Sequence, residues 1–262
     1  MSITNHPVDL RDLGRAADDC GLHTLWVADH LVQADPAAKA TDPMLEAYSV
    51  LCFLSAVTSR VRLGAMVSPV TFRAPALLVK TVTTLDVLSG GRAWLGLGAG
   101  YQADEAEAIG LPLPPVGERF RLLEETLRLA AATWKGDTPL SYPPPVARPP
   151  VLIGGTGEQR TLRLVAEHAD ACNLFDVPDG GATIRRKLDV LRRHCDAVGR
   201  DFGGITKTVA TGLADGEPAA AFAARCAELR SYGMDHVVVI TRGRPLTPRD
   251  VEVVAQAPGL IS

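Results

Sequence analysis

Short apolar segments alternate along the chain with longer segments in which apolar residues recur every three or four positions. The first kind is typical of strands buried on both faces, and the second of amphipathic helices. Strands are predicted at Ile3 and over residues 23–28, 61–67, 93–98, 151–154, 170–174, 205–211 and 236–240. Helices are predicted over residues 8–20, 42–58, 75–89, 118–134, 158–168, 182–198 and 218–230, with a last one from Thr247.

This alternation amounts to about eight strand–helix units, close to the ~250 residues of a typical (β/α)₈ barrel. A doubly wound Rossmann-like sheet is the competing layout. No charged or Ser/Gly-rich linker interrupts the chain, and the proline-rich residues 139–150 are too few to be more than a loop. We therefore predict an α/β protein with a (β/α)₈ TIM barrel, built as a single domain over residues 1–262. In such barrels the chemistry lies at the C-terminal ends of the strands.

Composition narrows the class of protein and its surroundings. The net charge of −3 gives no general attraction to nucleic acid or to an anionic membrane. The five cysteines are scattered and form no C-x-x-C pair, which argues against a disulfide framework or a zinc site. Residues 1–7 lack the pattern of a signal peptide, and the apolar run 47–57 is too short to cross a bilayer. We expect a cytoplasmic protein without a metal, a membrane partner or a nucleic-acid partner.

The second predicted strand ends at Asp29-His30. An imidazole beside a carboxylate at a strand end can exchange a proton near neutral pH. A loop histidine that only caps a backbone group would give the same sequence, so both interpretations stay open.

Glycine and proline gather at the ends of the third and fourth strands. Ser68-Pro69 ends the third strand and suggests a bulge, although an ordinary turn into the helix at Pro75 would look the same. The fourth strand ends with glycines at 96, 98 and 100. This spacing misses the dinucleotide fingerprint by one residue and opens no helix, so NAD(P) binding through it is rejected. Glycines there would let a planar ligand approach the backbone.

The fifth strand ends at Gly154-Gly155-Thr156-Gly157, and Thr156 with Gln159 three residues later predicts a capping box. The free N–H groups of Gly157 and Glu158 would then form a phosphate site at a helix start. A well-capped barrel helix without a ligand is the alternative. Asn173 at the end of the sixth strand would lie near this site.

With these residues in view, the chain resembles the luciferase-like monooxygenase superfamily, in its branch that uses the deazaflavin coenzyme F420. The resemblance runs from about Leu10 to Val239 and depends on several motifs occurring in order. The most specific segments are residues 25–30, 70–78, 84–92, 95–100 and 153–164. It implies a barrel, usually dimeric, that binds FMN or F420 with the ring in its mouth, and hence an oxidoreductase with a small-molecule substrate.

The resemblance also implies roles for individual residues. His30 would transfer a proton, Asp29 would contact the ring, and a bulge with a non-proline cis peptide would fall within Ala65-Met66-Val67. The cofactor's phosphate would bind at Gly155, Thr156 and Gly157. The full cofactor-binding set implied by these strand ends is Asp29, Ala65, Met66, Val67, Ser68, Gly98, Ala99, Gly100, Gly154, Gly155, Thr156, Gly157 and Asn173.

The choice of cofactor depends on two segments. Several FMN-dependent members carry an arginine in the loop after the fourth strand, where this chain has Gly98-Ala99-Gly100. The Trp26-to-His30 segment is also more similar to the deazaflavin enzymes, so we predict hydride transfer between F420 and a small organic substrate. An FMN-dependent monooxygenase and a non-catalytic flavin- or deazaflavin-binding barrel remain the alternatives.

The chain departs from the family pattern in three places. The first strand is very short, and the insertion before the fifth strand is reduced to residues 136–150. These two departures support the non-catalytic alternative. Sugar-phosphate dehydrogenases of the branch carry a glutamate and a tryptophan where this chain has Tyr101 and Ala34. Their substrate is therefore not carried over.

Overall fold

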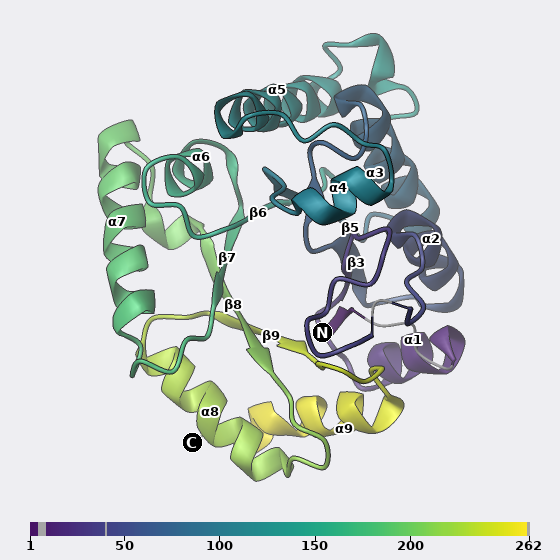
Figure 1. The fold of residues 1–262 in the computed structure, drawn as a ribbon, viewed down its shortest axis with the longest axis vertical. Helices are drawn as coiled ribbons and strands as arrows, with labels where there is room; N and C mark the ends of the chain where they lie inside the picture. The colour runs from purple at the N-terminus through teal and green to yellow at the C-terminus, as the bar shows by residue number, and fades with distance from the viewer. Residues whose placement is uncertain (5–8, 40, 261–262) are drawn as a thin grey trace.

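The strands form the staves of a closed barrel with the helices outside it, in a computed structural model that describes residues 1–4, 9–39 and 41–260 (Figure 1). The strands are β1 (Ser2–Ile3), β2 (Thr24–Val27), β3 (Arg62–Ala65), β4 (Ser68–Pro69), β5 (Ala93–Gly98), β6 (Val151–Gly154), β7 (Ala171–Phe175), β8 (Thr206–Gly212) and β9 (His236–Ile240). The longer helices are α1 (Leu10–Asp19), α2 (Ala47–Val57), α3 (Pro75–Ser89), α5 (Val116–Lys135), α7 (Ala182–Val198) and α8 (Ala219–Ser231). The shorter ones are α4 (Ala103–Ala108), α6 (Thr161–His168), α9 (Pro248–Gln256) and the 3₁₀ turns η1 (Pro139–Ser141), η2 (Phe202–Gly204) and η3 (Ala257–Leu260).

The strand pairings confirm the predicted (β/α)₈ barrel. Every pair is parallel, and β1, although it has only two residues, joins β2 to β9 through Ser2. At the far end of this strand order β3 pairs with β5. β4 follows β3 after a bulge and pairs with β5 further along, so β3 and β4 together fill one strand position of the barrel. Residues 136–150 contain η1 and no strand, as the shortened insertion predicted.

Side chains fill the barrel and its outer layer. Trp26, Leu152, Ala171 and Val238 form a cluster inside the barrel, and the ring of Trp94 lies 5.5 Å from that of Trp26. A larger cluster of aliphatic residues packs the strands against the helices. The strands are thus buried on both faces, which is why they read as continuous apolar runs in the sequence.

A bulge separates β3 from β4, and the Met66–Val67 peptide within it is cis, as the family resemblance predicted. The side chain of Val67 occupies the space beside two glycines at the ends of the neighbouring strands. A Cβ atom at Gly98 or Gly154 would lie 2.8 Å from Val67, and one at Gly96 would lie 2.0 Å from the Ala65 carbonyl oxygen. The glycines therefore make room for this bulge. The expectation that they also let a planar ligand approach the backbone stays a prediction.

Several predicted elements differ from those in the structure. The strand predicted over 61–67 stops at Ala65, because the bulge interrupts it. The helix predicted from Asp42 begins at Ala47, because the Asp42 carboxylate accepts from Lys39 N while Glu46 accepts from Ser49 N and caps α2. The short helix α4 lies in what was predicted to be a loop. Val8, the predicted start of the first helix, lies outside the described residues, and α1 begins at Leu10 with Asp9 as its N-cap.

No helix among the described residues combines the length and the apolar character needed to span a bilayer.

We predict that Gly96→Ala destabilises the protein strongly, because the new methyl group would overlap the Ala65 carbonyl oxygen and backbone cannot move aside cheaply. Overpacking typically costs about 1–3 kcal/mol in the free energy of unfolding, and an overlap with backbone places this change at the upper end. Urea unfolding followed by circular dichroism measures this change. Gly212→Ala in β8 is the matched control, because an added Cβ there meets nothing within 4 Å. Equal stability of the two variants would contradict the packing described for the bulge.

Candidate active site at the barrel mouth

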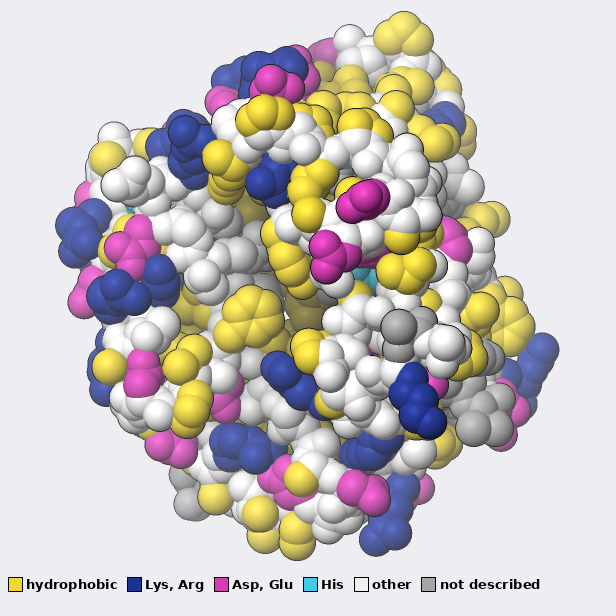
Figure 2. Space-filling model, viewed as in Figure 1, with side chains coloured by type: hydrophobic (Ala, Val, Ile, Leu, Met, Phe, Trp, Pro, Cys, Tyr) yellow, Lys and Arg dark blue, Asp and Glu magenta, His cyan; other side chains and the backbone are white. Residues whose placement is uncertain are grey.

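The C-terminal ends of all the strands meet at one mouth of the barrel, as they must in a parallel sheet. Gly154 pairs in register with Asn173, and Val67 touches both Gly98 and Gly154. Asp29 lies two residues after β2, the strand next to β3. Asp29, Val67, Gly98, Gly154 and Asn173 therefore lie at one mouth, the end of the barrel where the chemistry was expected. Figure 2 shows a hollow in the middle of the molecule, with hydrophobic side chains along part of its rim.

Asp29 is the centre of a buried polar network. Its carboxylate accepts hydrogen bonds from Ser68 Oγ at 2.6 Å and from Arg73 Nη1 and Nη2 at 2.6 and 3.0 Å. Arg73 also donates to Glu46 Oε1 at 2.5 Å and lies over the ring of Tyr48. The Asp29 side chain is fully buried, so its charge depends on these partners for compensation.

The direction of the hydrogen bonds in this network follows from the number of available protons. Ser68 has one hydroxyl proton and gives it to Asp29, so the Tyr48 hydroxyl donates to Ser68 Oγ across 2.8 Å. Burial, followed by the nearby Asp29 charge, raises the pKa of Tyr48 above its ordinary value. Tyr48 is therefore a neutral donor that anchors α2 to the residue after the bulge.

The network changes how Asp29 can act on a ligand. Both of its carboxylate oxygens are engaged by protein donors, and the side chain is inaccessible. It positions Ser68 and Arg73, and a direct ring contact through its side chain would require these bonds to open. The ring contact itself stays a prediction.

His30, the neighbour of Asp29, has a different partner. Its Nδ1 lies 2.7 Å from Glu105 Oε2, on helix α4. The other oxygen of Glu105 accepts from the backbone N–H of Leu31 at 2.6 Å and of Val32 at 3.4 Å. The Glu105 side chain is 1% exposed, whereas that of His30 is 21% exposed. The imidazole is therefore held from the protein side and reaches solvent on the other.

The predicted capping box after β6 does not form. Helix α6 begins at Thr161 with Arg160 as its N-cap and no side-chain cap, so Thr156 lies outside it. The chain turns at Gly155 with φ of 118°, and the Thr161 side chain then packs close to Gly157, where an added Cβ would lie 2.9 Å from its Oγ1. This packing delays the first helical turn beyond the residues where the capping pattern placed it.

The segment after β6 nevertheless keeps unused donors. Within the described part of the chain, the N–H groups of Thr156, Gly157 and Glu158 donate to no protein acceptor. A run of N–H groups of this kind suits an anion. A cavity of about 120 Å³, lined in part by Thr156 and Lys187, adjoins the segment. Lys187 pairs with the Glu158 carboxylate at 2.8 Å and brings positive charge to this corner.

Asn173 lies in register with Gly154 and is buried. Its Oδ1 accepts from Thr208 Oγ1 at 2.9 Å. Within the described residues its amide nitrogen has no acceptor, so that nitrogen is the group left for a ligand, near the segment after β6.

Sequence reasoning missed Glu46, Tyr48, Arg73 and Glu105. Arg73 lies inside a segment that supported the family resemblance, but nothing local indicated that it pairs with Asp29. Glu105 belongs to an acidic stretch that reads as a solvated surface. Its position just after the strand-four glycines was the one signal that placed it near the mouth.

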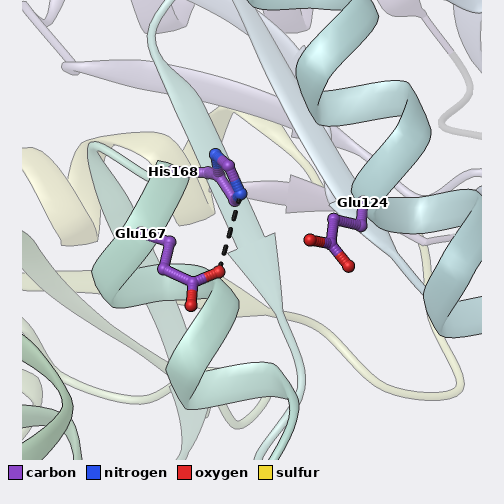
Figure 3. A group of neighbouring side chains, drawn as sticks. All are labelled: Glu124, Glu167 and His168. Atoms are coloured by element: carbon purple, nitrogen blue, oxygen red, sulfur yellow. Dashed lines mark ion pairs between the residues drawn. The ribbon is translucent and has the colours of Figure 1, made fainter. Parts of the chain in front are cut away.

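A cavity and a cluster of titratable side chains lie away from the mouth and take no part in the candidate site. A cavity of about 760 Å³ lies at the opposite end of the barrel, against the first residues of β2 and β9. Glu124, Glu167 and His168 lie close together on α5 and α6, with ligand atoms within 4.8 Å of one another (Figure 3). Arginines on the same helices already pair with both carboxylates, so this group is a surface charge cluster.

We predict that Asp29→Asn destabilises the protein by about 3 kcal/mol, because it leaves the largely buried Arg73 without its main counter-charge. Glu46→Gln removes the other partner of Arg73, but Glu46 is 37% exposed, so the expected cost is below about 1 kcal/mol. Urea unfolding of both variants measures the difference. If Glu46→Gln costs as much as Asp29→Asn, the assignment of Asp29 as the centre of the network is wrong.

The chain is similar in sequence to proteins from several bacteria. It is 36% identical over 129 residues to an F420-dependent glucose-6-phosphate dehydrogenase of Kineococcus radiotolerans, which covers 49% of this chain and 37% of the relative. A dehydrogenase of the same name from Amycolatopsis mediterranei is 32% identical over 132 residues, or 39% of that relative. The chain thus matches less than half of the length of these two enzymes. An uncharacterised protein of Mycobacterium tuberculosis is 30% identical over 247 residues, or 82% of each chain.

Solved structures share the fold at low sequence identity. An F420-dependent secondary alcohol dehydrogenase, in complex with an F420–acetone adduct, matches with a TM-score of 0.84 at 14% identity, over 100% of this chain and 97% of that one. The F420-dependent tetrahydromethanopterin reductase of Methanopyrus kandleri matches with a TM-score of 0.78 at 16% identity, over 99% and 97%. A family model described as luciferase-like monooxygenase matches residues 2–256. The chain therefore belongs to the luciferase-like monooxygenase family.

Proposed function

We propose that this protein is an oxidoreductase that uses coenzyme F420 to move a hydride to or from a small organic substrate, with His30 exchanging the proton. One observation carries the proposal. A partly exposed imidazole held by a buried carboxylate and a run of unused main-chain N–H groups lie at the same mouth of a luciferase-like barrel. The first suits proton transfer, and the second suits the anionic part of a cofactor.

Relatives support the choice of cofactor. The dehydrogenases from Kineococcus radiotolerans and Amycolatopsis mediterranei carry F420 in their names, as do two of the structural neighbours. When bound, the deazaflavin supplies a ring carbon that accepts or donates a hydride. The residues of this chain would bind it, orient it and hold the proton.

The residues present fit such a cofactor. Thr156, Gly157 and Glu158 offer N–H groups to a phosphate, and Asn173 offers an amide nitrogen beside them. Val67, packed against the strand-end glycines, gives the mouth a rigid apolar wall. His30 lies in the loop after β2, and the strands β3 and β5 lie between β2 and β6. The proton-exchanging group and the anion site are thus on different sides of the mouth.

The substrate of the sugar-phosphate relatives is not extended to this chain. Residues at the places of their glutamate and tryptophan are Tyr101 and Ala34, and Tyr101 is largely exposed. We propose a small organic substrate of another kind.

We also propose that the chain forms a homodimer through α3 and the loop beside it. Leu77 and Leu88 are exposed on α3, and Tyr142 and Val146 are exposed on the proline-rich loop. This loop is tied to the helix by a hydrogen bond from Lys80 to the Tyr142 carbonyl oxygen. An apolar face of this kind is typical of a surface that a partner covers.

The remaining proposals concern organisation and compartment. The barrel takes up the described chain from β1 to α9, which supports a single domain over residues 1–262. All five cysteines are free, which supports a reducing compartment such as the cytoplasm.

We predict that the wild-type protein binds F420 more tightly than FMN. Fluorescence titration of the protein with each cofactor measures the two affinities. His30→Ala should slow turnover by about 10²–10⁴ because a positioned proton donor and acceptor is lost, while F420 affinity changes little.

Thr156→Asp should weaken F420 binding by about tenfold or more, since it places a carboxylate beside the anion site. Thr156 is preferable to Gly155 here, because the φ of 118° at Gly155 would strain any side chain.

Other outcomes reject particular parts of the proposal. Tight FMN binding with oxygen-dependent turnover would assign an FMN-dependent monooxygenase instead. Cofactor binding without turnover of any substrate in a broad panel would indicate a binding protein. Wild-type turnover by His30→Ala would make the histidine structural and transfer the proton role to water or Tyr101.

For the dimer, light scattering at micromolar concentration should give twice the chain mass, and Leu88→Arg should shift the protein to the monomer. Val198→Arg on α7 introduces the same charge at another exposed apolar position and should leave the dimer intact. A wild-type monomer would show that the α3 face has no second copy on it.

A further inference from the structure

Glu105 is a buried carboxylate for which hydride transfer and cofactor binding give no explanation. It belongs to α4, a helix of six residues, and its side chain is 1% exposed. Among the described residues, its side chain forms hydrogen bonds with His30 Nδ1 and with the backbone N–H groups of Leu31 and Val32. A charge buried to this degree is retained at a substantial desolvation cost, so its partners indicate its role.

Proton counting around Glu105 decides the state of the histidine. An ionised carboxylate only accepts hydrogen bonds, and the neutral imidazole carries one proton on one of its two nitrogens. The contact between His30 Nδ1 and Glu105 Oε2 therefore requires the proton on Nδ1. The other nitrogen, Nε2, is then an acceptor.

We propose that Glu105 is a positioning residue that selects the Nδ1–H tautomer of His30 and so makes Nε2 the proton acceptor at the barrel mouth. In the oxidation direction, Nε2 takes the proton that the substrate releases as its hydride leaves, and the imidazolium returns that proton in reduction. The consequence for turnover rests on the proposed function, whereas the tautomer is a property of the protein by itself.

A purely structural role for Glu105 must be separated from this one, because its Oε1 also closes the loop through Leu31 and Val32. Glu105→Gln makes the separation. The amide oxygen can still accept from the two backbone N–H groups, while the amide NH₂ faces His30 Nδ1. A donor at that place requires an unprotonated Nδ1, so the proton moves to Nε2 while the loop stays closed.

The tautomer is measured directly by long-range ¹H–¹⁵N correlation NMR on the labelled protein without cofactor, at a pH where the imidazole is neutral. The His30 signal is assigned by its loss in His30→Gln. We expect Nδ1–H in the wild type and Nε2–H in Glu105→Gln. Glu107→Gln, an exposed change on the same helix, is the matched control and should leave the wild-type tautomer.

Turnover supplies the second readout. Glu105→Gln should lower kcat by about 10²–10⁴, as loss of the correct histidine tautomer does in other proton-transfer sites. Its F420 dissociation constant should stay within about twofold of the wild-type value, because the anion site is untouched.

Two results would overturn the proposal. One is a wild-type His30 with its proton on Nε2, which needs no variant to fold. The other is a Glu105→Gln protein that retains Nδ1–H or keeps the wild-type kcat. If the tautomers are as expected but the wild type neither binds nor turns over F420, the positioning by Glu105 stands and the proposed cofactor is wrong.

Discussion

The steric position of Val67 is the constraint on which the barrel mouth depends. Its side chain occupies the space that side chains at positions 98 and 154 would fill, so β5 and β6 both end there in glycine. The same turn of the chain sets the next residue, Ser68, where its hydroxyl reaches the Asp29 carboxylate. The packing inside the mouth and the charge network behind it therefore both depend on the same bulge. A change that moves one of them displaces the other.

Asp29 and His30 show how two adjacent residues connect the mouth to distant parts of the chain. Asp29 meets Arg73 from the segment that leads into α3, and His30 meets Glu105 from α4. In both pairs a fully or nearly fully buried carboxylate accepts from several donors, which is the condition under which a buried charge is tolerated. The two pairs connect the loop after β2, which contains Asp29 and His30, to the segments that follow β4 and β5.

The proposed chemistry divides between two parts of the mouth. The segment after β6 offers main-chain donors and a nearby lysine, which suit the anionic end of a ligand and carry no proton chemistry. The end of β2 offers the titratable group. Since β3 and β5 lie between these two staves, a ligand anchored at β6 must extend past Val67 to reach His30. Binding and proton exchange are thus assigned to residues that can be altered separately.

The sequence by itself determined the barrel. Buried strands and amphipathic helices differ in the spacing of their apolar residues, and that spacing can be seen within each short segment of the sequence. It also placed Asp29, Val67, Gly98, Gly154 and Asn173 at one mouth, since parallel strands end at a common edge. Only the tertiary structure decided that Val67 fills the space beside the glycines, that Thr156 caps no helix, and that Glu105 is buried on His30. The physical reason is that burial and pairing depend on which groups arrive from elsewhere in the chain. Glu105 lies 75 residues from its histidine, and no local pattern distinguishes it from an exposed glutamate.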